Sequence, residues 1–263
     1  MKRFISDIQD NFKYLIYSAK SELKAEVANS YLNWIWWVLQ PLCFMLIYTF
    51  MFSVVFNARE DYFPIFIFIG ITMWDFFNKN ITQSVKMIKR NKPIVTKVYV
   101  PKFILTISKM FVNGFKMAIN FGIIVAMMIV FKVPVSINLL YLIPLMVTLW
   151  VITFGCMCIV MHFGVFIEDL SNVITIVFKM LFYMTGVFYD IHKRIGKSYP
   201  ELANFMGNYN PMAYLVSSVR KCLIYTGEPD LKFLVMWFAI GIILSVIGVK
   251  IIYKYENGYA KVV

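Results

Sequence analysis

The sequence predicts an all-α membrane protein with six transmembrane helices. Of its 263 residues, 60% are hydrophobic, and the mean hydropathy of +0.71 is typical of a chain that lies largely in lipid. Apolar runs long enough to cross a hydrocarbon core of about 30 Å recur along the chain. Lys and Arg collect at the ends of these runs, as expected of membrane-protein loops. The length leaves room for one membrane domain, residues 31–263, and no sizeable soluble domain.

Residues 1–30 predict an amphipathic helix that lies in the membrane interface. Apolar residues recur at helical spacing, while lysines occupy other positions on the wheel. The apolar set is Ile8, Phe12, Leu15, Ile16, Ala19, Leu23 and Val27, and the lysines are Lys13, Lys20 and Lys24. This segment is too polar for a secretory signal, so we expect no cleavable leader.

We expect spans at about 31–56, 62–78, 103–131, 139–167, 170–189 and 233–253. In this topology, fifteen of the 26 basic residues fall on the side of the two termini and eight on the other, which places both termini in the cytoplasm. Before the last span, Pro200–Met206 and a segment from Asn210 to Gly227 predict two short helices on the outer side. The acidic turn Glu168–Asp169 is atypical of an inner loop.

The loop Asn78–Lys102 contains seven basic residues and no acid, so we expect it to face the cytoplasm. Gln83–Asn91 predicts a short helix that Pro93 stops. Val85, Met87 and Ile88 would give this helix an apolar patch, and Lys86, Lys89, Arg90 and Lys92 would surround the patch with charge. Such a surface suits docking onto a soluble partner, and a solvated loop is the alternative.

Three lysines, Lys109, Lys116 and Lys179, fall inside predicted spans. A charge there costs several kcal/mol unless it is paired or hydrated, so each is a candidate functional residue. Lys109, Asn113, Lys116 and Asn120 form one helical stripe, which should face a hydrated path or a protein partner. Lys109 could instead reach the interface, and Lys179 could pair with Asp75.

Other kinds of chemistry find little support in the residue pattern. Gly196-Lys197-Ser198 resembles the end of a phosphate-binding loop, but Ile191 stands where the motif needs glycine, so we expect no ATP site or other cofactor. The cysteines (43, 156, 158 and 222) and the two histidines lack metal-ligand spacing. The net charge of +12 lies at span ends, which favours anionic lipid over nucleic acid.

Several motifs follow one another in a specific order. The first span opens with Ser30-Tyr31-Leu32-Asn33-Trp34-Ile35-Trp36-Trp37-Val38-Leu39-Gln40-Pro41, and the second holds Gly70-Ile71-Thr72-Met73-Trp74-Asp75-Phe76-Phe77. Lys97-Val98-Tyr99-Val100-Pro101, Glu168-Asp169-Leu170-Ser171-Asn172 and Asn210-Pro211-Met212-Ala213 come later. Together they resemble the permeases of type-2 ABC exporters for bacterial surface polysaccharides, which include the teichoic acid, O-antigen, capsule and rhamnan exporters. Glu168 departs from the family pattern, which has arginine there.

The resemblance implies a homodimer in the bacterial cytoplasmic membrane, paired with two copies of an ATPase subunit that holds ATP and Mg. It implies that a lipid-linked polymer passes between the protomers, and that the N-terminal and basic-loop helices contact the ATPase. Sugar rings stack on aromatic side chains, and lysines attract phosphate. We therefore expect a translocation path that includes Trp34, Trp37, Trp74, Asp75, Asn113, Lys116, Asn120 and Lys179. We expect Lys116 and Lys179 to attract the phosphates of the substrate.

Two alternatives remain. One is a type-2 exporter of a drug or another small cargo. The other is an integral-membrane enzyme acting on lipid-linked sugars, which would need acidic or basic groups gathered in one cleft. The acids are scattered along the sequence, at Asp75, Glu168–Asp169, Asp190, Glu201, Glu228 and Asp230, so no catalytic residue is expected.

Overall fold

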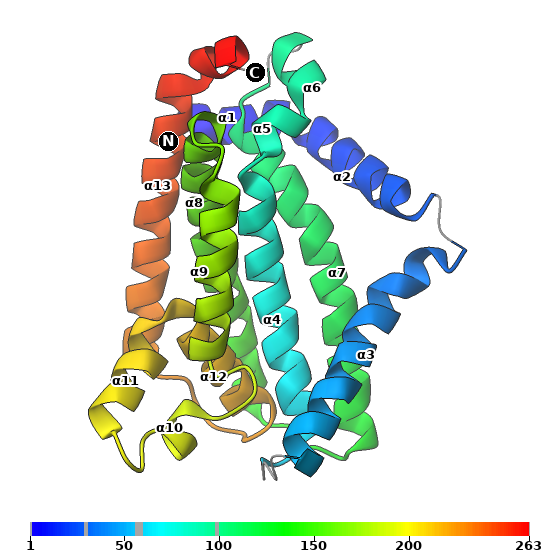
Figure 1. Cartoon of the computed structure of the whole chain (residues 1–263), viewed down its shortest axis with the longest axis vertical. Coiled ribbons are helices and arrows are strands. Elements are labelled where there is room, and N and C mark those ends of the chain that lie inside the picture. The colour runs from blue at the N-terminus through cyan, green and yellow to red at the C-terminus, as the bar shows by residue number, and fades with distance from the viewer. Residues whose placement is uncertain (1, 29–30, 56–59, 98–99, 263) are drawn as a thin grey trace.

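The computed structural model describes residues 2–28, 31–55, 60–97 and 100–262, and within these ranges every regular element is helical (Figure 1). The N-terminal half contains α1 (Lys2–Asp10), α2 (Phe12–Val27), η1 (Asn33–Ile35), α3 (Trp36–Thr49), η2 (Phe50–Val55), α4 (Phe63–Ser84), α5 (Met87–Arg90), α6 (Lys92–Lys97) and α7 (Phe103–Val130). The second half contains η3 (Ile137–Tyr141), α8 (Leu142–Phe166), α9 (Leu170–Met184), α10 (Ile191–Arg194), α11 (Pro200–Tyr209), α12 (Pro211–Leu223) and α13 (Leu231–Val262).

Helix α4 is the centre of the bundle. It packs against α3, α7, α8, α9 and α12, and sixteen of its 22 residues are buried. Its first turns read Phe-Pro-Ile-Phe-Ile-Phe-Ile-Gly-Ile, which leaves no polar face. A helix that is apolar on every side can be surrounded by lipid or by other helices, and here the neighbouring helices surround it.

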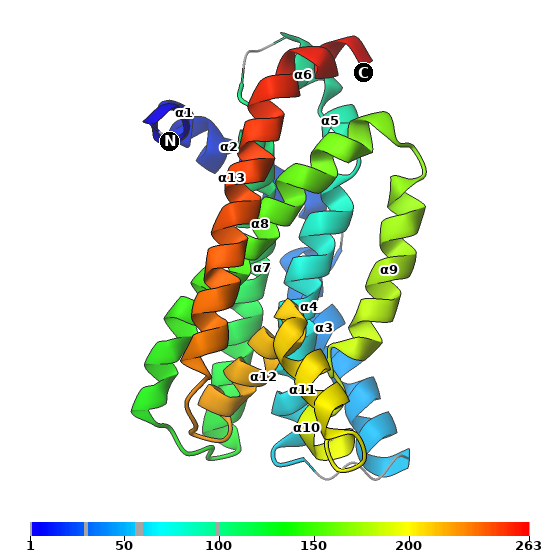
Figure 2. The ribbon, with the colours of Figure 1, turned by 90° about the vertical axis from the view of Figure 1, so that its left-hand side faces the viewer.

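Within the described ranges, three helical segments are long and apolar enough to cross a membrane: Phe103–Val130, Ile137–Phe166 and Leu231–Glu256. Trp36–Phe52 and Leu170–Met184 are shorter apolar helices. Helix α13 runs alongside α8, and α9 stands on the other side of α4 (Figure 2). The chain is therefore an integral, multi-pass membrane protein.

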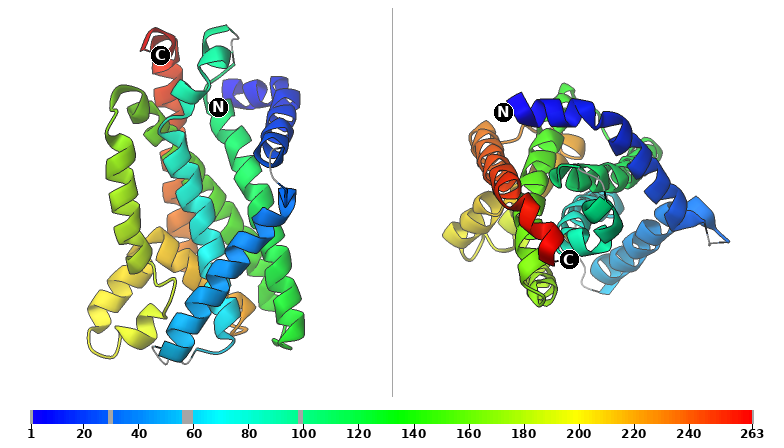
Figure 3. Two further views of the ribbon diagram at one scale, coloured as in Figure 1. Left: turned by 45° about the vertical axis from the view of Figure 1, so that its right-hand side comes forward. Right: turned by 90° about the horizontal axis from the view of Figure 1, so that it is seen from above.

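The two ends of the bundle have different structures. Figure 3 shows α1, α2 and the last turns of α13 at one end, and α10 and α11 at the other. The hydroxyl of Tyr253 donates to Asp7 Oδ2 at 2.5 Å, which joins α13 to α1. Lys89 Nζ donates to Glu168 Oε1 at 3.1 Å. The atypical acidic turn thus lies at the same end as the basic loop and offsets part of its charge.

Several predicted boundaries need correction. The N-terminal helix is divided into α1 and α2 around Asn11. Helix α4 continues to Ser84, six residues beyond the predicted end of the second span, and α9 ends at Met184 rather than at 189. The two short helices before the last segment are confirmed as α11 and α12. Leu215 and Val219, which share one face of α12, are buried.

Candidate functional site

The main cavity is a space of about 1020 Å³ bounded by side chains from α2, α3, α4, α7 and α9. Seven of the eight predicted path residues line it: Trp37, Trp74, Asp75, Asn113, Lys116, Asn120 and Lys179. Trp34 does not line it. This residue belongs to η1, ahead of α3, and its side chain is 59% exposed. Residues that are more than 140 positions apart in the sequence thus line the same cavity.

Aromatic rings form one wall of the main cavity. The ring centroids of Phe178 and Phe182 lie 5.8 and 5.4 Å from that of Trp74. Of the residues that α9 contributes to this space, only Lys179 was predicted. Thr175, Phe178, Lys179, Phe182 and Tyr183 all line the cavity, and their spacing places them on one helical face. The spacing of the aromatic residues around Lys179 in the sequence is the signal that indicates this face.

Three residues of the polar stripe of α7 have protein partners. Lys109 pairs with Glu22 of α2, which offsets its charge. Asn113 Nδ2 donates to Asn80 Oδ1 of α4 at 2.9 Å. Lys116 pairs with Glu26 of α2. Each of these polar groups therefore has a protein partner on a neighbouring helix.

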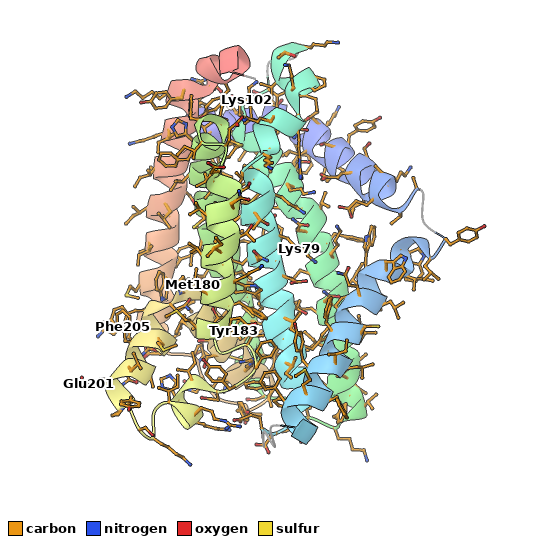
Figure 4. All side chains as sticks on the ribbon, in the orientation of Figure 1. Lys79, Lys102, Met180, Tyr183, Glu201 and Phe205 are labelled. Carbon is orange, nitrogen blue, oxygen red and sulfur yellow. The ribbon has the colours of Figure 1, made fainter. Side chains whose placement is uncertain are left out.

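The suggested pair between Lys179 and Asp75 does not form among the described residues. Asp75 Oδ2 instead accepts from Lys79 Nζ, one turn further along α4, at 2.9 Å. Both residues and Lys179 line the main cavity, and Figure 4 places Lys79 midway along the bundle and Tyr183 near the end of α9. Three ammonium groups and two carboxylates, of Glu26 and Asp75, therefore line this space.

The apolar patch predicted in the basic loop is not a surface, and the prediction of an exposed patch was wrong. Val85, Met87 and Ile88 are only 2%, 4% and 1% exposed. The expected helix is replaced by the end of α4 and by α5 and α6, and Pro93 lies in the first turn of α6 rather than stopping a helix. These apolar residues pack inward against the bundle.

The exposed side chains of this loop are mainly basic. Lys86, Arg90 and Lys92 are exposed, and Lys89 is partly covered by its bond to Glu168. Docking through this loop stays a prediction. In this conformation it depends on the exposed cations of this loop, including Lys97 of α6, rather than on an apolar patch.

A second pocket, of about 470 Å³, lies at the opposite end of the bundle and gathers acids that are distant in sequence. Asp61, Asp190 and Asp230 line it, so the acids are less scattered than expected. Asp190 Oδ1 accepts from the backbone amides of His192 and Lys193, at 2.9 and 3.1 Å. Asp230 Oδ1 accepts from the amide of Lys232 at 3.0 Å. Asp190 and Asp230 therefore cap local turns of backbone.

The loop before α4 is tied to α10. Lys193 Nζ donates to Glu60 Oε2 at 2.5 Å, and the Tyr225 hydroxyl donates to the same oxygen at 3.3 Å. The bond from Glu60 raises the pKa of Lys193 above its ordinary value. No group of three His, Cys, Asp or Glu side chains suited to a metal occurs in the part of the chain that the structure describes.

Arg220 of α12 is a buried cation with three backbone partners. It is 4% exposed and uses three nitrogens on three backbone carbonyls. Its Nε donates to Phe66 O at 2.9 Å, Nη1 to Gly186 O at 2.7 Å and Nη2 to Val187 O at 2.6 Å. One side chain of α12 thus fastens α4 to the turn after α9.

Comparison with known proteins agrees with this architecture. The profile of the family described as "ABC-2 type transporter" matches residues 15–224, which include the main cavity and α12. The chain is similar to two proteins of Klebsiella pneumoniae named "O-antigen export system permease protein RfbA", with 27% and 25% identity over 252 residues and 95% coverage of both chains. A Myxococcus xanthus protein of the same name is 25% identical over 255 residues, with 93% coverage. The match over most of its length shows that this chain belongs to the ABC-2 type transporter family.

Proposed function

We propose that this chain is the membrane-spanning permease subunit of an ABC exporter that moves a lipid-linked polysaccharide or teichoic acid across the bacterial cytoplasmic membrane. The observation that carries the proposal is the likeness to permeases named for O-antigen export, which extends over 95% of this chain. A relationship of that length covers the elements around the main cavity and not just a shared span.

The main cavity supports the same conclusion. Its wall combines aromatic faces with amide and ammonium groups. Sugar rings pack against aromatic faces, and ammonium groups attract phosphate. A surface of this kind suits a glycan joined to a lipid through phosphate better than a purely apolar drug. A type-2 exporter of a drug or other small cargo is the second candidate, because the family profile by itself does not distinguish cargo.

The proposed assembly is a homodimer with two copies of an ABC ATPase subunit. The chain has six spans with both termini cytoplasmic, and the ATPase supplies ATP hydrolysis. The end that carries α1, α2, α5 and α6 supports this arrangement, because it presents exposed basic residues outside the bundle. Purified alone, the permease should hydrolyse no ATP above a buffer control, and hydrolysis should appear when the ATPase is added.

Gene deletion in the native bacterium tests the function. Loss of the permease should remove the polymer from the cell surface and leave lipid-linked polymer inside, and the wild-type gene should restore export. A deletion that changes only sensitivity to drugs, with normal surface polymer, would instead support the small-cargo exporter.

A further inference from the structure

Two ion pairs join α2 to α7, and they differ in what surrounds them. Glu22 pairs with Lys109, and Glu26, one turn further along α2, pairs with Lys116. Glu26 and Lys116 both line the main cavity, whereas Glu22 and Lys109 do not. The same helix therefore makes one pair away from the cavity and one in its wall.

The Lys116 pair is open to exchange. The side chains of Lys116 and Glu26 are 22% and 31% exposed, so a ligand in the cavity can approach both. Lys116 Nζ also lies 5.7 Å from the centre of the Trp37 ring, which leaves the ammonium between an aromatic face and a carboxylate. An ion pair that is partly exposed gains little net stability, so another anion can replace its carboxylate at small cost.

We propose that Lys116 is a phosphate subsite in the main cavity and that Glu26 is its built-in competitor. A phosphate or diphosphate group that enters the cavity takes the place of the Glu26 carboxylate on the Lys116 ammonium. This inference rests on the proposed function for the chemical class of the ligand. It adds the residue that receives the phosphate and the residue that withholds it in the resting state.

Lys116 and Lys79 differ in which helix supplies the carboxylate that pairs with them. The partner of Lys79 is Asp75 of the same helix, so their contact is local. The partner of Lys116 belongs to α2, and displacement of Glu26 therefore removes one of the two ion pairs that hold α2 on α7. Lys179 adds a further positive charge to the same wall, for which the described residues show no ion pair. Phosphate binding is thereby coupled to the attachment of α2.

The expected effect follows from competition. The apparent affinity for an external anion equals the intrinsic affinity multiplied by the fraction of molecules in which Lys116 is available. If Glu26 holds the ammonium about nine-tenths of the time, neutralising Glu26 raises the apparent affinity about tenfold. Neutralising Glu22 should have no such effect, because Lys109 lies outside the cavity.

The test measures binding of radiolabelled inorganic pyrophosphate to the full-length permease in phosphatidylcholine nanodiscs. Glu26→Gln should bind several-fold to about tenfold more tightly than wild type. Glu22→Gln is the matched control, since it removes the same type of ion pair from the same helix, and should bind as wild type does. Lys116→Gln should bind more weakly, and Glu26→Gln with Lys116→Gln should show no gain.

Equal affinity of wild type and Glu26→Gln would overturn the proposal, as would an equal gain in Glu22→Gln. Lys116→Arg, which keeps the charge, should restore binding, so a folding defect in Lys116→Gln does not decide the result. Repeating the titration with phosphatidylglycerol in the nanodiscs identifies the source of the phosphate. Weaker pyrophosphate binding means that ordinary lipid headgroups occupy the subsite. Unchanged binding means that the subsite prefers a diphosphate to lipid headgroups. The binding assay does not depend on transport. The phosphate subsite can therefore be disproved while the proposed export function holds, and the export function can be disproved while the subsite holds.

Discussion

At the scale of single residues, buried charge is the feature that most constrains this molecule. Arg220 has three backbone carbonyls as partners and packs its guanidinium carbon 3.5 Å from the centre of the Phe66 ring. The planar fork of arginine suits three acceptors in different directions, which a single ammonium cannot reach together. Arg220 therefore has a geometric role, holding α12 in register with α4 and the turn after α9.

Arg220→Lys should destabilise the protein by about 2 kcal/mol or more, because at least one buried carbonyl loses its donor. The measurement is the fraction of detergent-solubilised protein that remains monodisperse after heating. Lys221→Met, at the exposed neighbouring position, is the control and should behave as wild type does. Equal heat resistance of Arg220→Lys and wild type would contradict the role in fastening α12.

The polar residues of the cavity were predictable because they interrupt apolar runs. Lys116, Asn113 and Asp75 stand out in an apolar sequence, and helical spacing places the α7 residues on one side. The partners of those residues were not predictable. Glu22 and Glu26 look like ordinary polar positions of an amphipathic helix, and only the crossing of α2 over α7 brings them to the lysines.

At the scale of elements, the packing of α8 near the basic loop depends on a residue without a side chain. A Cβ added to Gly164 would lie 2.1 Å from the carbonyl oxygen of Val85. That oxygen belongs to the backbone just after α4, which cannot move aside without shifting α5. Gly122 of α7 offers a contrast, because an added Cβ there would meet nothing within 4 Å.

Gly164→Ala should therefore destabilise the fold by about 1–3 kcal/mol through overpacking. Gly122→Ala should be neutral or stabilising by up to about 1 kcal/mol, since alanine favours helix over glycine. Midpoints of thermal unfolding, followed by a thiol-reactive dye as the buried Cys158 and Cys222 become accessible, compare the two variants. A loss of stability in Gly122→Ala equal to that in Gly164→Ala would show that the contact with Val85 is unimportant.

In the basic loop, apolar residues that were correctly identified were wrongly predicted to form an exposed surface. Val85 and Ile88 were recognised as an apolar pair, but the sequence does not say whether such a pair faces a partner or its own bundle. The continuation of α4 to Ser84 turns both residues inward. Replacing either residue by Asp is expected to disrupt folding, and therefore would not test docking.

The exposed cations give a cleaner test of docking. A triple variant with Lys86→Glu, Arg90→Glu and Lys92→Glu should still insert and fold. Its co-purification with the ATPase should fall at least severalfold, because the new carboxylates would repel the acidic surface that the three cations are proposed to contact. The matched control reverses Arg194, Lys197 and Lys232, three exposed cations at the other end of the bundle. Retention of the complex by the first triple variant would place the docking site elsewhere.

At the scale of the whole molecule, composition and apolar runs were enough to predict an all-helical membrane protein. They were not enough to predict which helix is central. Helix α4 carries Asp75, Asn78, Lys79 and Asn80 in its second half, so its mean hydropathy is lower than that of the outer helices. It is nevertheless the most enclosed, because its polar residues face the cavity or bond to α7.

The two ends of the bundle should face opposite sides of the membrane, which cysteine labelling can establish. The exposed residues Ser198, next to α10, and Thr96, on α6, mark these ends. With a membrane-impermeant maleimide on intact cells, Ser198→Cys should be labelled, whereas Thr96→Cys should react only after the membrane is opened. The positive-inside rule sets this direction, because the cationic α5–α6 end belongs in the cytoplasm. Wild type measures the background from native thiols, of which Cys43 is exposed. Labelling of Thr96→Cys on intact cells, with Ser198→Cys protected, would invert the topology and remove the basic loop from the reach of a cytoplasmic ATPase.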